Sequence, residues 1–276
     1  DTMLYSVVKN PLLTADELNH DLEVISNWSY QWKLLFNPDP DKPAVEIIFS
    51  HKKVLQNHPE LYLNGNPIVR VDSHKLLEMV LDSNLTFEKH IYSKVKLTNK
   101  SIGILKYLSS HIPLKTLIQI YKSFIRPHLD YGDVLYHIPS SFNIFNSALT
   151  LHPLMNVIER VQYNAALAIT GSWRCSNRNR LYEELGWESL SDRRWFRSLS
   201  LFNKIYNDMT PKYLKDNLTF HRLQLYGTNN PFLLRNIFCN TTRYRNSFFP
   251  DSIKIWNSIG KELQTAQSVT LFNHQS

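Results

Sequence analysis

The chain has few cysteines, few glycines and no long apolar run, and each shortage argues against a class of protein. Its two cysteines, Cys175 and Cys239, lie far apart and match no zinc-ligand spacing, which disfavours a zinc site or a disulfide framework. None of its 7 glycines forms the loop that binds phosphates in Rossmann or P-loop proteins. No run of about 18 apolar residues exists, and the first residues lack the features of a signal peptide. We therefore expect a chain that works inside the cell, in the nucleus or the cytoplasm, with no membrane partner.

Acidic residues are missing from one long stretch. The chain as a whole has 31 Lys and Arg against 24 Asp and Glu, a net charge of +7, yet no acid occurs from Lys89 to Leu129. Ordinary solvated helix faces mix both signs, whereas a face of one sign suits a polyanion such as a nucleic-acid backbone. An ordinary solvated face remains the alternative. The candidate nucleic-acid-binding residues are Lys89, Lys94, Lys96, Lys100, Lys106, Lys115, Lys122 and Arg126.

Apolar spacing predicts a mixed fold for the first 87 residues. Residues 2–8 read as a short strand whose hairpin partner is missing. The capping-box pattern Thr14–Glu17 predicts an amphipathic helix to about Lys33, with its last apolar contact at Trp32. Residues 44–49 read as a buried strand, and Asn64-Gly65 predicts a type I′ hairpin turn.

Helical spacing dominates after residue 87. Pro113 is expected near the start of the second helix, Pro127 is expected to end it, and Gly171 is expected to cap a later one. Residues 207–231 read as a loop with one helical turn. The predicted helices are 88–110, 113–126, 157–169, 190–206 and 248–263.

Four residues are candidate ligands of a metal ion, namely His128, Asp130, Asp133 and His137. Their spacing matches no recurrent ligand motif. The simpler interpretation is that His128, at the end of a helix, interacts with the terminal carbonyl groups of that helix or with nucleic acid. We favour that second interpretation.

Two other charged groups have a structural and a functional interpretation. Glu183 and Glu184 are consecutive, so on a helix they do not face each other, and a solvated surface is favoured over acid–base catalysis. Arg193 and Arg194 precede Trp195. Arginine beside aromatics suits phosphate contact and base stacking, but aromatics at this spacing occur more often in a core.

Several short motifs follow one another in a defined order. They are Asp1–Tyr5, Asn27–Trp32, Phe36–Lys42, Glu46–Phe49, Ser123–Gly132, Val161–Ala166, Thr170-Gly171, and Phe248–Pro250 continuing to Trp256-Asn257. In this order they resemble the C-terminal half of the reverse transcriptases of non-LTR (LINE-type) retrotransposons. The resemblance covers nearly all of the chain.

This resemblance implies an α+β fold that follows the right-hand polymerase plan. Residues 1–87 would be a remnant of the palm, with a helix and a small antiparallel sheet. Residues 88–130 would form a basic helical thumb, and residues 131–276 a mostly helical C-terminal region.

The resemblance also implies site residues. Asp1 would be the second Asp of the catalytic turn and a ligand of Mg²⁺, which the intact parent enzyme uses. Lys42 falls where the family has a lysine that is thought to protonate the leaving pyrophosphate. One departure stands out, because Glu78 occupies a position where the family usually has glycine in a strand that grips the primer.

We therefore expect part of an RNA-directed DNA polymerase that binds a template–primer duplex, RNA or DNA, and whose N-terminal part is missing. One carboxylate cannot hold two cations, so we expect neither a bound metal nor polymerisation by this chain alone. The alternatives are an inert nucleic-acid-binding module and a decayed element copy without selected function.

Overall fold

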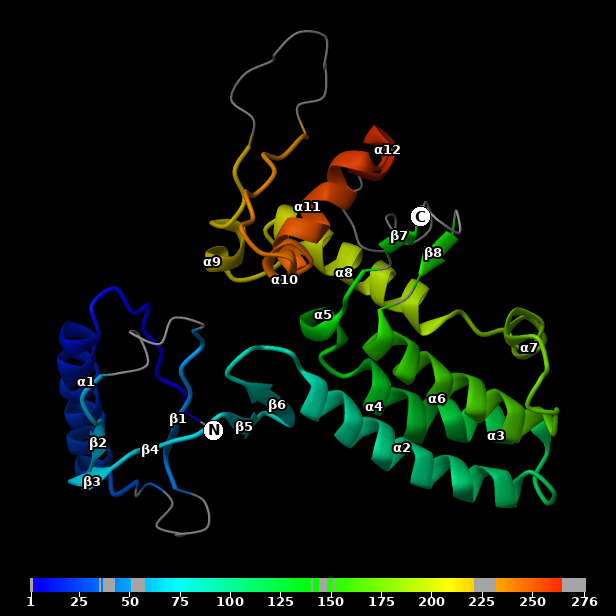
Figure 1. The fold of residues 1–276 in the computed structure, drawn as a ribbon, viewed down its shortest axis with the longest axis horizontal. Helices are drawn as coiled ribbons and strands as arrows, with labels where there is room; N and C mark the ends of the chain where they lie inside the picture. Colours follow the sequence, from blue (N-terminus) through cyan, green and yellow to red (C-terminus); the bar gives the residue numbers. More distant parts are fainter. Residues whose placement is uncertain are drawn as a thin grey trace, which may run out of the picture. The chain divides into compact units, whose positions relative to one another are not determined.

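The computed structural model describes residues 2–34, 36, 43–50, 58–139, 141–143, 148–150, 152–220 and 232–264. These residues combine many helices with two-stranded sheets, so the chain belongs to the mixed helix-and-sheet class. The chain divides into two compact units, Asp1–His90 and Ile91–Ser276. Figure 1 shows the elements of each unit, and each unit is described by itself.

The first unit begins with α1 (Pro11–Gln31). This helix starts three residues before the predicted capping box, because the Asn10 side chain accepts a hydrogen bond from the Leu12 amide and Pro11 suits the first turn. Asn19 fastens α1 to the neighbouring strand, since its side chain accepts from the Tyr62 amide at 2.9 Å. Trp32 lies just past the helix and is 65% exposed, so the prediction that it packs on the apolar face is wrong.

Two strand predictions in this unit need correction. Residues 2–8 form no strand, because in the described part of the chain no segment pairs with their backbone groups. The strand predicted at 44–49 is only β1 (Val45–Glu46), which pairs in parallel with β4 (Val69–Arg70). Its side chains are half-buried, and Phe49 is exposed.

The hairpin predicted at Asn64-Gly65 is confirmed. β2 (Tyr62–Leu63) pairs antiparallel with β3 (Asn66–Pro67). Asn64 and Gly65 have φ values of 52° and 76°, as a type I′ turn requires.

A second hairpin joins β5 (Ser73–Leu76) and β6 (Met79–Asp82). Its turn residues, Leu77 and Glu78, also have positive φ values, 46° and 64°. Neither is glycine, so both bear the steric cost of the left-handed conformation. Glu78 therefore stands at a position whose backbone geometry favours the glycine of the resembled family.

After β6, the Asp82 carboxylate organises the loop that leads into α2 (Glu88–Leu108). It accepts hydrogen bonds from the amides of Thr86 and Phe87 at 2.9 and 2.8 Å and from the Thr86 hydroxyl at 3.0 Å. Burial pushes the pKa of Asp82 upward, but these bonds outweigh it and the pKa is lowered. The predicted helix 88–110 is confirmed, and its seam of Ile91, Thr98, Ile102 and Leu105 is buried.

The next helical run continues past Pro127, so the prediction that Pro127 ends it is wrong. α3 (Leu114–Ile120) continues into a π-helical turn, η2 (Tyr121–Ile125), and then into α4 (Arg126–Asp130). Within the wide turn the Arg126 amide donates to the Tyr121 carbonyl, five residues back. Proline lacks an N–H and crowds the carbonyl four residues before it, and a π turn at this place relieves that conflict.

The remaining helices of the second unit carry most of its core. α6 (Pro153–Thr170) and α8 (Leu190–Tyr206) are confirmed, and Gly171 caps α6 with a φ of 67°. α11 (Phe248–Ser258) ends before Ile259, so the predicted final helix is divided in two. The smaller elements are α5 (Asp133–Tyr136), β7 (Ser141–Asn143) paired antiparallel with β8 (Ala148–Thr150), α7 (Arg178–Leu185), α9 (Lys212–Lys215), α10 (Thr242–Arg245) and α12 (Lys261–Gln264).

One apolar cluster joins α8 to α11. Phe202 and Ile205 of α8 pack with Ile253 and Trp256 of α11, all with no exposed surface. The rings of Phe202 and Trp256 lie 5.4 Å apart. None of the described helices is both long and apolar enough to cross a membrane.

The strained turn gives a stability prediction. Replacing Glu78 with glycine should stabilise the chain by about 1 kcal/mol, because relief of the left-handed conformation exceeds the loss of the exposed Lys75–Glu78 ion pair. Glu78→Ala is the matched control, since it loses the same ion pair and keeps the strain. Chemical denaturation measures the free energy of unfolding of both variants. Equal values for Glu78→Gly and Glu78→Ala would show that the left-handed conformation at this position has no steric cost.

Candidate nucleic-acid interface

The two catalytic candidates, Asp1 and Lys42, lie outside the described residues. Their roles therefore stay predictions. Among the residues that the structure describes, no group of three His, Cys, Asp or Glu side chains lies close enough to hold a metal ion. His128, Asp130, Asp133 and His137 therefore form no such group.

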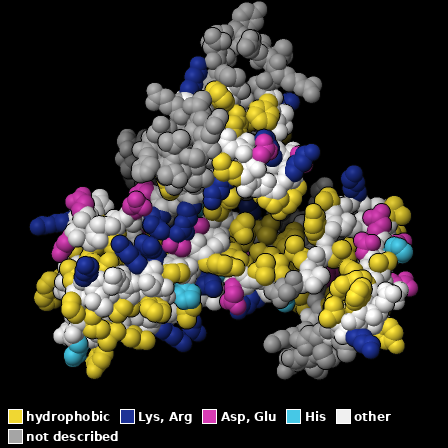
Figure 2. Space-filling model, turned by 180° about the vertical axis from the view of Figure 1, so that it is seen from behind, with side chains coloured by type: hydrophobic (Ala, Val, Ile, Leu, Met, Phe, Trp, Pro, Cys, Tyr) yellow, Lys and Arg dark blue, Asp and Glu magenta, His cyan; other side chains and the backbone are white. Residues whose placement is uncertain are grey.

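The acid-free stretch places most of its cations on the surface. Five lysines are exposed and make no hydrogen bond or ion pair with any described residue, namely Lys96, Lys100, Lys106, Lys115 and Lys122. Figure 2 shows Lys and Arg side chains spread between apolar side chains on one face of the molecule. Such lysines keep their full charge available for a solvated polyanion.

The other three cations of the stretch interact with groups inside the molecule. Lys89 donates to the Ser73 hydroxyl at 2.8 Å. Lys94 is half-buried and already has an interaction inside the molecule. Arg126 is half-buried beside Asp130. The eight predicted residues are thus not equivalent.

On α2, Lys96 and Lys100 stand one turn apart, on the side of the helix away from the buried seam. Aromatic side chains share this outer side. Tyr107 is 71% exposed, and Tyr92 is also exposed. Cations with aromatics between them suit contact with phosphates and bases.

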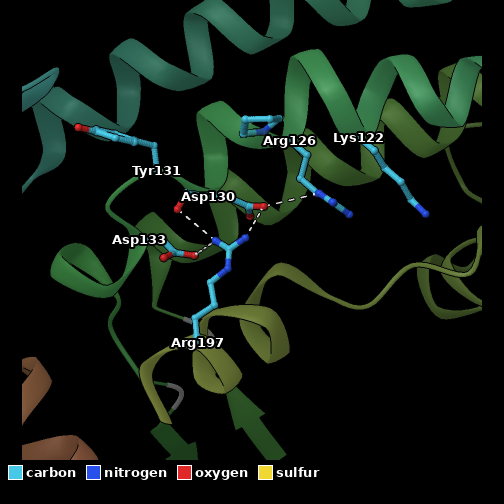
Figure 3. A pocket seen from close by; sticks show the side chains of 7 residues that line it. Lys122, Arg126, Asp130, Tyr131, Asp133 and Arg197 are labelled. Carbon is cyan, nitrogen blue, oxygen red and sulfur yellow. Dashed lines mark hydrogen bonds and ion pairs between the residues drawn. The ribbon is translucent and has the colours of Figure 1, made fainter. Parts of the chain in front are cut away.

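Asp130 is the centre of an ion cluster at the end of the basic helices. Its Oδ2 lies 2.6 Å from Arg197 Nη2, 3.1 Å from Arg193 Nη2 and 3.5 Å from Arg126 Nε. Its side chain is only 14% exposed. Figure 3 shows the Arg197 guanidinium lying between the carboxylates of Asp130 and Asp133.

Arg197 makes two further contacts with the same segment. Its Nη1 donates to Asp133 Oδ2 at 2.7 Å and to the Asp130 carbonyl at 3.1 Å. Burial raises the pKa of Asp133, and this effect exceeds the opposing effect of the arginines. The planar guanidinium therefore fixes the segment that connects α4 to α5.

Arg194 has a different environment, because it is 1% exposed. Its Nη1 approaches the Met155 sulfur at 3.7 Å. Burial, together with this nearby positive charge, lowers the pKa of His137 to about 4. Arg194 thus lies in the interior and Arg193 in the ion cluster, whereas Trp195 is 38% exposed, so the prediction that this aromatic lies in the core is wrong.

A second buried polar network, which the sequence did not reveal, fastens α6 to its neighbours. Glu159 accepts from the Tyr182 hydroxyl at 2.9 Å and from the Leu190 amide at 3.0 Å. Gln162 accepts from the Tyr121 hydroxyl at 2.9 Å and donates to the Glu188 carbonyl at 2.8 Å. Burial raises the pKa of Glu159. The available signal was that Glu159 and Gln162 fall on the apolar side of α6.

Tyr121 adds an aromatic contact to this network. Its ring stacks on Trp187 with centroids 4.2 Å apart. Because Tyr121 is the first residue of η2, the π turn is held by Gln162 of α6 and by Trp187, which follows α7. By contrast, Glu183 and Glu184 on α7 are exposed, as the solvated interpretation predicts.

An open pocket of about 440 Å³ lies beside the ion cluster. Its wall is formed by Lys122, Arg126, Pro127, Asp130, Tyr131, Asp133 and Arg197. Figure 3 shows Lys122 and Arg126 projecting from the same helical run.

Comparison with known proteins gives the chain's relatives. The chain is 24% identical over 147 residues to the RNA-directed DNA polymerase from mobile element jockey of Drosophila melanogaster. It is 25% identical over 127 residues to the jockey polymerase of Drosophila funebris. It is 24% identical over 160 residues to the probable RNA-directed DNA polymerase from transposon X-element of Drosophila melanogaster. The chain is thus similar to RNA-directed DNA polymerases of mobile elements.

The match to these reverse transcriptases is partial on both sides. It covers 52%, 45% and 57% of this chain, but only 16%, 13% and 16% of the three relatives. No family model matches the chain, and no solved structure matches it. The similarity supports the resemblance drawn from the motifs over about half of this chain.

The ion cluster predicts a large effect of removing one carboxylate. Asp130→Asn should destabilise the second unit by about 2–4 kcal/mol, because it leaves partly buried guanidinium groups without their shared anion. Glu184→Gln removes an exposed carboxylate and should change the free energy of unfolding by less than about 0.5 kcal/mol. Equal effects in denaturant unfolding would show that the cluster contributes nothing.

Proposed function

We propose that this chain is the part of a non-LTR reverse transcriptase that follows the catalytic turn, and that its basic helices hold a nucleic-acid duplex by the phosphate backbone. In this proposal residues 1–87 are the end of the palm, residues 88–130 are the thumb and residues 131–276 are the following helical region. The observation that supports it best is the set of five exposed lysines whose side chains have no partner among the described residues.

The relatives support the parent activity. Their names describe them as RNA-directed DNA polymerases. A polymerase must hold a duplex without reading its sequence, and contacts to phosphates do this. The lysines of α2 and of the run from α3 to α4 suit that task, because lysine presents a mobile, solvated charge.

The catalytic part of the proposal rests on Asp1 and Lys42. Asp1 would supply one carboxylate ligand for Mg²⁺, and Lys42 would be placed to donate a proton to the leaving pyrophosphate. A site with two metal ions needs carboxylates beyond Asp1. The proposal therefore assigns the duplex-holding role, and not polymerisation, to this chain by itself.

The salt dependence of binding tests the proposal. The logarithm of the affinity for an RNA–DNA hybrid should fall linearly with the logarithm of salt concentration. Reversing four of the lysines, Lys96, Lys100, Lys106 and Lys115, to Glu should reduce this slope by about 3, because each lost phosphate contact removes about 0.7–0.9. Fluorescence anisotropy at several salt concentrations measures both slopes.

The matched control reverses four exposed lysines outside the acid-free stretch, namely Lys204, Lys212, Lys254 and Lys261. The net charge changes equally in both variants, so a general electrostatic effect would reduce both slopes alike. Equal slopes for the two variants would refute the proposed interface.

A further inference from the structure

The pocket beside the ion cluster adjoins the π turn η2. Lys122 lies within this turn, and Arg126 follows it directly. Single π turns inside helices frequently occur at functional sites. Two independent features therefore meet here, an irregular helical turn and an open pocket lined by cations.

The charges around the pocket do not balance. Four cations, Lys122, Arg126, Arg193 and Arg197, face two carboxylates, Asp130 and Asp133. One more carboxylate, Glu188, reaches Arg193 only at 3.7 Å and is mostly exposed to solvent. The cluster thus keeps an excess of positive charge.

Three cations line the pocket, and Arg197 is already paired with Asp130 and Asp133, so the excess lies on Lys122 and Arg126. Arg193 and Arg197 donate hydrogen bonds to Asp130, but Arg126 comes no closer than 3.5 Å and its Nε makes no hydrogen bond. Lys122 has no partner among the described residues. Both side chains can therefore bind an incoming anion without first breaking a hydrogen bond to Asp130.

We infer that this pocket binds a phosphoryl group, with the Arg126 guanidinium and the Lys122 ammonium as its direct ligands. A forked guanidinium beside a mobile ammonium matches the several oxygens of phosphate. A dianionic phosphate also matches the two cations in charge. Pro127 and Tyr131 line the same pocket and offer apolar surface to an attached sugar.

The phosphoryl group has two possible sources, a nucleic-acid backbone or a free phosphate or nucleotide. The first source deepens the proposed function and rests on it. The second source does not depend on it.

Binding of pyrophosphate to the full chain, measured by isothermal titration calorimetry, tests the pocket. The double variant Lys122→Gln/Arg126→Gln should bind at least about tenfold more weakly, because it loses both proposed charge-assisted contacts. The matched control is Lys204→Gln/Lys212→Gln, which neutralises two exposed lysines outside the acid-free stretch and should leave pyrophosphate affinity unchanged.

The single variant Lys122→Gln is the control for folding, because Lys122 is exposed and its replacement should leave the melting temperature unchanged. This variant should still lose part of the affinity for pyrophosphate. No pyrophosphate binding by the unaltered chain, or equal binding by the control and a folded double variant, overturns the inference.

Competition by an RNA–DNA hybrid separates the two sources. Displacement of pyrophosphate by the hybrid assigns the pocket to the backbone. Retention of pyrophosphate in saturating hybrid assigns it to a free phosphate, and the pocket assignment stands in both cases. A different experiment tests the proposed function. It fails if reversing the charge of Lys96, Lys100, Lys106 and Lys115 leaves the salt dependence of hybrid affinity unchanged.

Discussion

The shared carboxylate of Asp130 is the interaction on which the second unit depends. It stands at the end of the basic helical run and joins Arg193 and Arg197 of α8. Because α8 also supplies Phe202 to the apolar cluster with α11, the ion cluster connects the basic helices to the C-terminal core. One acid, placed directly after 41 residues without any, thus fixes the end of the run from α3 to α4 against α8.

Arginines and lysines have separate tasks in this arrangement. The arginines of α8 point inward, where planar forks make several hydrogen bonds at once to carboxylates and carbonyls. Five lysines of the acid-free stretch face water, where a compact mobile charge binds phosphate without fixed geometry. Arg126 stands between the two groups, since it touches the cluster and also lines the open pocket. This division explains why the acid-free stretch carries lysine almost throughout.

Short sequence patterns predicted the helices and the hairpin that depend on interactions between residues close in the chain. α2, α6 and α8 follow from apolar spacing, and the Asn64-Gly65 hairpin follows from the backbone freedom of its two residues. The π turn before Pro127 makes its contacts with Gln162 and Trp187, which lie far along the chain, so the sequence suggested only a helix end. The pairing of Arg193 and Arg197 with Asp130 spans more than sixty residues, and no short pattern encodes it. Asp1 and Lys42 remain predictions from resemblance.

Mapping lysine reactivity in one experiment tests the central claim most directly. The chain is acylated with and without a saturating RNA–DNA hybrid, and each modified lysine is quantified by mass spectrometry. The proposed interface predicts strong protection of Lys96, Lys100, Lys106, Lys115 and Lys122, with Lys204, Lys212 and Lys254 unchanged. Protection spread evenly over both groups, or confined to the second, would contradict the assignment of the acid-free helices to the phosphate backbone.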